Sequence, residues 1–247
     1  MKEIVIFFAK LSFVLILLFL FTNCNKEKEF DRLDLTINSN DSSLIVKPKL
    51  KYLALGDSYT IGQGVKSDEN FPNQLTSKLL NDGFELDELK IIATTGWSTD
   101  DLLQNIYRSN LDSNFNLVSI LIGVNNQFRK MDTTLYKTQL IEIIEQAIIY
   151  AGNNSNNVIA LSIPDYWYTP FGQNYPDKTS VEIDWYNTYK KQICAKYKIK
   201  FYNITPITQK GLDEPDLVAK DNLHPSAKMF ALWVKEFYKD VLQILSE

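Results

Sequence analysis

The chain has 247 residues, of which 45% are hydrophobic and 23% are charged, a composition typical of a globular protein with one sizeable core. Its formal net charge of −4 argues against a nucleic-acid binder that relies on electrostatic attraction. The two cysteines, Cys24 and Cys194, provide neither a disulfide framework nor the spacing of a zinc site. His224 is the only histidine, so a general base active near neutral pH must be His224 or a carboxylate.

The first 23 residues have the pattern of an export signal. Residues 4–21 are almost entirely apolar, and Cys24 follows shortly after them. We interpret residues 1–23 as a bacterial lipoprotein signal peptide, whose cleavage leaves Cys24 as a lipidated N-terminus. The match to the cleavage motif is loose, because a small residue is usual where Asn23 stands. The alternative is a signal anchor that stays in the membrane. Both interpretations place the rest of the chain outside the cytoplasm, attached to a membrane of the cell envelope.

A polar segment separates this signal from the rest of the chain. Residues 24–48 are rich in Lys, Glu, Asp, Asn and Ser and show no sustained hydrophobic periodicity. Such a composition cannot bury enough apolar surface to form a core. We therefore predict a polar tether over residues 24–48 and a folded domain over residues 49–247.

From residue 49 onward, short apolar runs alternate with segments of helical periodicity. The apolar runs predict strands over residues 51–55, 90–93, 117–122, 158–163 and 201–204. The periodic segments predict helices over residues 71–80, 99–107, 133–150, 180–197 and 225–245. This alternation predicts an α/β domain with a parallel sheet of about five strands and helices on both faces. Such sheets bind ligands at the carboxyl ends of their strands.

Ser58 directly follows the first predicted strand, in the motif Gly56-Asp57-Ser58. The motif is not the G-x-S-x-G nucleophile elbow, because Thr60 stands where the second glycine belongs. A serine in a strand-to-helix turn is usually a helix cap. Ser58 is therefore a candidate nucleophile only if a general base lies beside it.

His224 is the candidate base, and Asp221 precedes it by three residues. Proline is favoured at the first position of a helix, so Pro225 predicts that His224 caps the last helix. Asp221 can then accept the Nδ1 hydrogen of His224 and leave Nε2 free to take a proton from a serine. The alternative for a lone histidine is a structural role.

Two further residues can supply hydrogen-bond donors at the same edge of the sheet. Gly96 follows the second predicted strand, and its lack of a side chain lets its backbone N–H approach a substrate closely. Asn125 follows the third strand, and its side-chain amide can donate to a developing oxyanion. Each residue taken alone also fits an ordinary turn.

The serine, glycine, asparagine and histidine occur in the order Ser58, Gly96, Asn125 and His224, and in this respect the sequence resembles the SGNH (GDSL-type) hydrolases. The resemblance spans about residues 51–242 and implies a three-layer αβα sandwich with a flavodoxin-like sheet. It implies that Ser58 is the nucleophile, that His224 is its general base and that Asp221 orients His224. It also implies that the backbone N–H groups of Ser58 and Gly96 and the side chain of Asn125 are the oxyanion donors.

The sequence departs from the family pattern at two positions. Tyr59 replaces the leucine of the named motif, and Asn126 replaces the aspartate that often follows the oxyanion asparagine. We expect these departures to affect substrate preference rather than activity.

The chemistry implied by this resemblance is acyl transfer to Ser58, which needs no metal and no cofactor. We expect esters with short acyl groups, for example acetylated carbohydrate, as substrates. Lysophospholipid or thioester substrates are alternatives, and so is a non-catalytic, membrane-tethered binding module of the same fold. The aromatic segment of residues 164–171 follows the fourth strand and either lines the substrate pocket or packs as a surface loop. The expected partners are an ester substrate and a membrane, with no nucleic acid.

Overall fold

A computed structural model describes residues 49–246 of the chain. The predicted signal peptide (1–23), the lipidation site Cys24 and the tether (24–48) lie outside the described residues. At the centre of the domain is a parallel sheet whose strands, in chain order, are β1 (Leu50–Gly56), β2 (Leu86–Ala93), β3 (Leu117–Leu121), β4 (Val158–Leu161) and β5 (Lys200–Tyr202).

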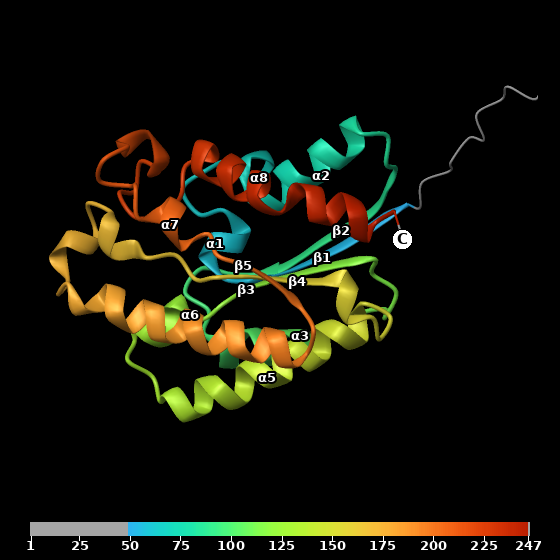
Figure 1. The fold of residues 1–247 in the computed structure, drawn as a ribbon, viewed down its shortest axis with the longest axis horizontal. Coiled ribbons are helices and arrows are strands. Elements are labelled where there is room, and N and C mark those ends of the chain that lie inside the picture. Colours follow the sequence, from blue (N-terminus) through green and yellow to red (C-terminus); the bar gives the residue numbers. More distant parts are fainter. Residues whose placement is uncertain (1–48, 247) are drawn as a thin grey trace, which may run out of the picture. The chain divides into compact units, whose positions relative to one another are not determined.

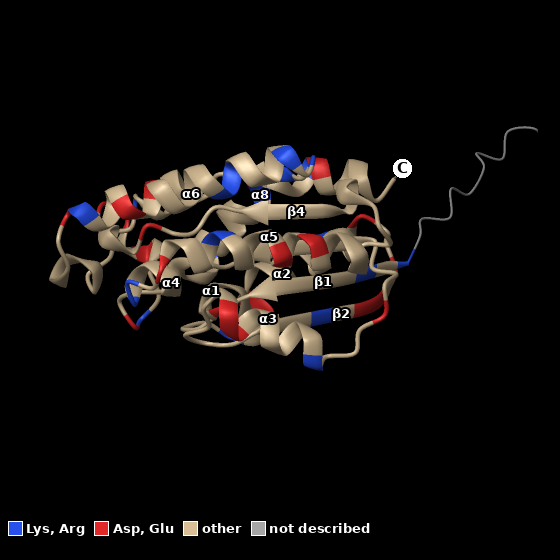
Figure 2. Cartoon of the chain, turned by 90° about the horizontal axis from the view of Figure 1, so that it is seen from below, with Lys and Arg blue, Asp and Glu red and all other residues tan. Residues whose placement is uncertain are grey.

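The strands are arranged in the order β2-β1-β3-β4-β5, which is the flavodoxin-like order of a doubly wound sheet. The strand order reverses between β1 and β3, and ligands bind doubly wound sheets at the carboxyl end of this junction. Strands β1, β3 and β4 are almost completely buried, which explains their continuous apolar sequences. Figure 2 shows charged residues on the edge strand β2 and none on β4.

Helices cover both faces of the sheet, as Figure 1 shows. Helices α2 and α8 pack together on one face, whereas α3, α5 and α6 pack on the other. The helices of the described residues are α1 (Ser58–Ile61), α2 (Phe71–Asn81), α3 (Thr99–Arg108), α4 (Val124–Phe128), α5 (Thr133–Tyr150), α6 (Lys178–Lys196), α7 (Thr205–Thr208) and α8 (Ala227–Ile244). Short 3₁₀ turns occur at Ser67–Glu69, Ser155–Asn157, Tyr166–Tyr168, Gly172–Asn174 and Pro215–Leu217. The three-layer αβα sandwich with a five-stranded parallel sheet is thus confirmed.

All five strands differ from their predicted bounds by at least one residue, and β5 ends at Tyr202 rather than at residue 204. The differences in β2 and β4 have clear physical reasons. β2 begins at Leu86 rather than at residue 90. The prediction missed the first half of this edge strand because that half is largely exposed and lacks an apolar pattern. β4 ends at Leu161 rather than at residue 163. The backbone N–H of Ile163 donates instead to Asn187 Oδ1 at 2.7 Å, so the chain leaves the sheet there. Among the described residues, no helix is both long enough and apolar enough to cross a membrane.

Candidate active site

Ser58 lies at the first position of α1, directly after β1. The helix is capped by Asp57, whose Oδ1 accepts the backbone N–H of Tyr59 at 3.0 Å. Because Asp57 is the cap, the Ser58 hydroxyl is free to interact with other groups. The turn also requires Gly56, since a Cβ atom there would lie 2.0 Å from Oγ1 of Thr60. The sequence around Ser58 therefore specifies a tight strand-to-helix turn that presents the serine at the carboxyl edge of the sheet.

His224 lies on the loop before α8 and not at the cap of that helix, so this prediction was wrong. The helix begins at Ala227 and is capped by Ser226, whose hydroxyl accepts a backbone N–H of the first turn. Serine is a strong N-cap residue. Pro225 instead pairs with Val218 in an isolated antiparallel bridge. This bridge fixes the backbone next to His224.

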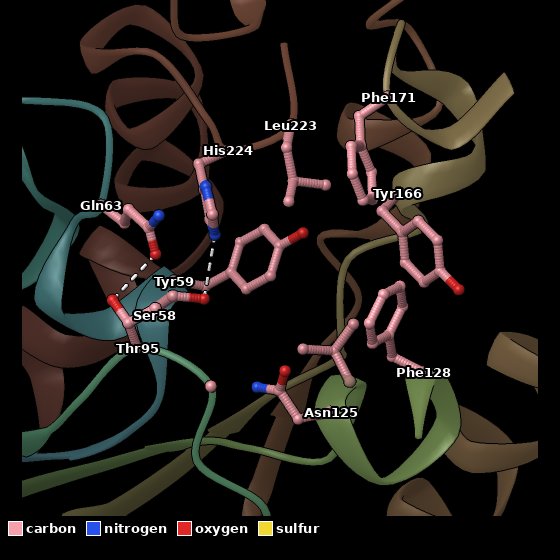
Figure 3. Close-up of a pocket in the computed structure, with 12 residues that line it drawn as sticks. Ser58, Tyr59, Gln63, Thr95, Asn125, Phe128, Tyr166, Phe171, Leu223 and His224 are labelled. Carbon is pink, nitrogen blue, oxygen red and sulfur yellow. Dashed lines mark hydrogen bonds between the residues drawn. The ribbon is translucent and has the colours of Figure 1, made fainter. Parts of the chain in front are cut away.

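The structure brings Ser58, His224 and Asp221 together, as Figure 3 shows for the first two. His224 Nε2 lies 3.0 Å from Ser58 Oγ, and His224 Nδ1 lies 2.7 Å from Asp221 Oδ2. The second carboxylate oxygen of Asp221 accepts the backbone N–H groups of His224 at 2.9 Å and of Leu223 at 3.0 Å. Asp221 therefore orients both the imidazole ring and the loop that carries it.

The electrostatic environment favours the neutral form of His224 and the ionised form of Asp221. Burial lowers the pKa of His224, although the hydrogen bond and the charge of Asp221 raise it in part. Burial alone would raise the pKa of Asp221. Hydrogen bonds from the backbone of His224 and Leu223 and from the His224 ring oppose this effect and hold the pKa below its ordinary value. A neutral imidazole with a free Nε2 can accept the Ser58 proton.

The loop after β2 places Gly96 at the pocket. Gly96 adopts φ +81°, a left-handed conformation that favours glycine. The Arg129 guanidinium donates to the Gly96 carbonyl and lies 3.6 Å from Asp101. These contacts help to hold the segment that contributes Thr95 and Gly96 to the cavity lining.

Asn125 lies in α4, directly after β3, and borders the same pocket. Its Nδ2 donates to the Trp97 carbonyl at 3.0 Å. A side-chain amide carries a second N–H, which remains available to a ligand. Asn126, next in the chain, accepts the backbone N–H of Thr99 at 3.0 Å and donates to its hydroxyl at 2.8 Å. Asn126 thus joins α4 to the start of α3 and supports the position of Asn125.

A cavity of about 230 Å³ opens beside Ser58 and is mostly apolar. It answers the question left open for residues 164–171, because Tyr166 and Phe171 line it. Trp167 does not line the cavity. Its Nε1 donates a hydrogen bond to the Tyr175 carbonyl at 3.1 Å. Tyr59, which we expected to affect substrate preference, also lines the cavity. The lining residues that sequence reasoning missed are Gln63, Thr95, Val124, Phe128 and Leu223.

Several of these missed residues are neighbours of motif residues in the chain. Thr95 precedes Gly96, Val124 precedes Asn125, and Leu223 precedes His224. A residue next to a site residue on a tight turn often lines the same cavity, and this is the signal that could have identified them. Within residues 49–246, no group of three or more His, Cys, Asp or Glu side chains could hold a metal ion.

Comparison with known proteins decides the family. The model of the GDSL-like lipase/acylhydrolase family matches residues 54–232. The chain belongs to this family. At the family level, the GDSL protein is therefore a hydrolase of the esterase and lipase type. No curated protein matches the sequence significantly.

Solved structures share the fold of this GDSL hydrolase. The psychrotrophic esterase EstA from Pseudoalteromonas sp. is 19% identical, with a TM-score of 0.61 over 79% of this chain and 98% of its own. The lipase/acylhydrolase from Enterococcus faecalis is 20% identical, with a TM-score of 0.61 over 78% and 95%. A variant of Axe2, an acetyl xylan esterase from Geobacillus stearothermophilus, is 18% identical, with a TM-score of 0.56 over 79% and 96%.

Proposed function

We propose that the protein is a serine esterase that hydrolyses carboxylic esters through an acyl-enzyme on Ser58. The observation that carries this proposal is the continuous chain of contacts from Asp221 through His224 to Ser58, at 2.7 and 3.0 Å, beside an apolar cavity. A nucleophile within hydrogen-bond distance of a base, itself oriented by a carboxylate, is the arrangement that activates a serine.

The geometry supports a two-step reaction. His224 Nε2 takes the Ser58 proton while Oγ attacks the ester carbonyl, and the resulting imidazolium is stabilised by Asp221. The oxyanion is stabilised by the N–H groups of Ser58 and Gly96 and by the Asn125 amide. His224 then protonates the leaving alcohol. In the second step, water gives a proton to His224 Nε2 while its oxygen attacks the acyl carbon. The bond from that carbon to Ser58 Oγ then breaks, His224 returns the proton to Oγ, and the acid is released.

Labelling with a fluorophosphonate tests this function, because the probe reacts only with an activated serine. We expect one label per chain on Ser58, with no label in Ser58→Ala. Heat-denatured protein is the control for nonspecific reaction. A folded protein that resists the probe would instead favour the non-catalytic binding module.

The cavity supports a preference for short acyl groups. Its volume of about 230 Å³ is small for a substrate pocket, and Leu223 and Tyr166 form part of an apolar wall. We expect p-nitrophenyl acetate to exceed the palmitate ester in kcat/KM by at least about ten-fold, the discrimination that one or two methylenes provide in an apolar pocket. Leu223→Ala should shift the preference toward longer chains, because Leu223 lines both this cavity and a smaller one, and its truncation enlarges the space for an acyl chain.

Leu212→Ala is the matched control, since Leu212 is 39% exposed and lies outside the cavity lining. This variant should keep the wild-type preference. A clear preference of the wild type for palmitate would contradict the prediction and favour a lysophospholipase. Within the short-acyl class, we propose acetylated carbohydrate as the physiological substrate. The test is release of acetate from an acetylated glycan, with the chemically deacetylated glycan as the blank. Release of acetate only from the acetylated glycan would favour this substrate over a phospholipid.

We further propose that Cys24 is the lipidated N-terminus of the mature, exported protein. The support is the apolar run of residues 4–21, which ends just before Cys24 and is followed by a polar segment. Expressed in a bacterium, the full chain should partition into detergent, and Cys24→Ala should block its processing. Cys194→Ala is the matched control and should be processed normally. A mature N-terminus at any other residue, found by N-terminal sequencing, would contradict the proposal.

A further inference from the structure

A lysine is buried beneath the active edge of the sheet. Lys190 lies on α6 and is 0% exposed. Its ammonium donates to the backbone carbonyl of Ile122 at 2.8 Å and to that of Leu161 at 3.1 Å. Lysine is almost never fully buried unless its charge has partners. The reaction described above makes no use of this group, so its position requires an explanation.

The two carbonyls mark the point where β3 and β4 separate. The register of these strands ends with Ile120 opposite Ala160, and Ile122 and Leu161 lie two residues and one residue beyond this pair. Buried carbonyls need hydrogen-bond donors, and the diverging strands no longer provide them to each other. The Lys190 ammonium takes over that role. It therefore joins two chain segments that would otherwise lose their connection at the edge of the sheet.

Each joined segment continues into the active site. Ile122 is followed by Gly123 and by α4, whose second residue is Asn125. Leu161 ends β4, and the chain then continues to Tyr166, which lines the cavity. An oxyanion donor must lie within about 2.7–3.1 Å of the oxyanion to stabilise it. The short path from Lys190 to Asn125 means that a shift of Ile122 would displace this donor.

A second buried charge lies near Lys190. Asp57 is 0% exposed, and its Oδ2 has no hydrogen-bond partner among the described residues. Burial raises the pKa of Asp57 to about 7, opposed by the Tyr59 N–H and by the charge of Lys190. Burial lowers the pKa of Lys190 to about 8, opposed by Cys194 and by Asp57. Each charge thus offsets part of the desolvation cost of the other. This favours the charged form of Lys190, which donates to the carbonyls at the strand ends.

We propose that Lys190 is a positioning residue, whose ammonium holds the end of β3 in place and thereby keeps the Asn125 amide aimed at the oxyanion. This inference rests on the proposed function, because it needs Asn125 to act as a donor. Lys190 does not line the cavity, so it acts on Asn125 through the backbone of Ile122 and not by contact with the substrate.

Lys190→Met tests the inference, because methionine keeps most of the side-chain length and removes the N–H donors. We expect kcat on p-nitrophenyl acetate to fall by up to about 100-fold, the loss that follows a misplacement of about 1 Å near the reacting groups. KM should change much less. Lys190→Gln retains amide donors and should recover part of the lost kcat. This second variant also keeps the test valid if Lys190→Met folds poorly.

A double-mutant cycle with Asn125→Ala separates positioning from a general loss of structure. Asn125→Ala alone should lower kcat by about 10²- to 10³-fold. In that background, Lys190→Met or Lys190→Gln should change kcat by less than about 3-fold, since the donor that Lys190 positions is already absent. Cys194→Ala, one helical turn further along the buried face of α6, should lower the melting temperature and leave kcat unchanged.

The outcomes of this cycle are distinct. An equal fold-loss from the Lys190 substitution in both backgrounds would overturn the positioning role and leave the proposed function intact. Wild-type kcat in folded Lys190→Met would also overturn it. If Asn125→Ala alone retained wild-type kcat, the oxyanion assignment and the inference built on it would both fail.

Discussion

Ser58→Ala and His224→Ala are each expected to lower kcat on an ester by on the order of 10⁶-fold. The serine forms the covalent bond, and the histidine takes the proton that allows it to form. His224 is the only histidine in the chain, so no other imidazole can replace it. Residues of one catalytic unit are strongly non-additive, and the double variant should cost little more than either single variant. Steady-state kinetics on p-nitrophenyl acetate would measure these losses.

The control for this prediction is Ser226→Ala, near His224 in the chain. Ser226 caps α8, and its loss should cost about 1 kcal/mol of folding free energy while leaving the contact between His224 and Ser58 intact. A near-normal kcat in this variant would show that a modest loss of stability does not abolish turnover. If folded His224→Ala retained wild-type kcat/KM, the mechanism proposed for this protein would be wrong.

The layers of the fold can be predicted from the sequence because buried positions are occupied mainly by apolar residues. β1 and β3 are covered on both faces, so their residues form continuous apolar runs that local periodicity detects. Helices such as α3 and α5 carry apolar residues at helical spacing and were predicted within one residue at each end. The placement of Ser58, Gly96 and Asn125 at one edge followed from the rule that parallel strands present their carboxyl ends together. His224 follows no strand, and its pairing with Ser58 rested on the preceding Asp221 and on the family resemblance.

Local sequence patterns do not predict features whose structure is determined by contacts between distant parts of the chain. Helices α1 and α4 have only four and five residues, too few to display a helical period. Pro225 fits the first turn of a helix as well as it fits the bridge that it forms with Val218. Lys190 is hardest to predict, because a lysine in a helix normally faces water. Its partner carbonyls lie 68 and 29 residues away, and only the folded chain brings them within hydrogen-bond distance.

Asp221→Ala is expected to lower kcat by about 10⁴-fold and to shift the pH dependence of the remaining activity to lower pH. The rate loss follows because the imidazole loses the carboxylate that fixes its orientation and stabilises its charged form. The pH shift has a defined sign. The hydrogen bond and the charge of Asp221 both raise the pKa of His224 against the lowering effect of burial. Without them this pKa falls further, so neutral His224 persists to lower pH.

The measurement is kcat/KM against pH, whose acidic limb reports the pKa of the base in the free enzyme. In the wild type, this limb should lie below the ordinary histidine pKa, because burial is the largest effect on His224. It should move to still lower pH in Asp221→Ala. Asp216→Ala is the matched control, since Asp216 pairs with Lys228 and not with His224. That variant should keep the wild-type limb. A limb that moves to higher pH in Asp221→Ala would show that the carboxylate does not stabilise the imidazolium.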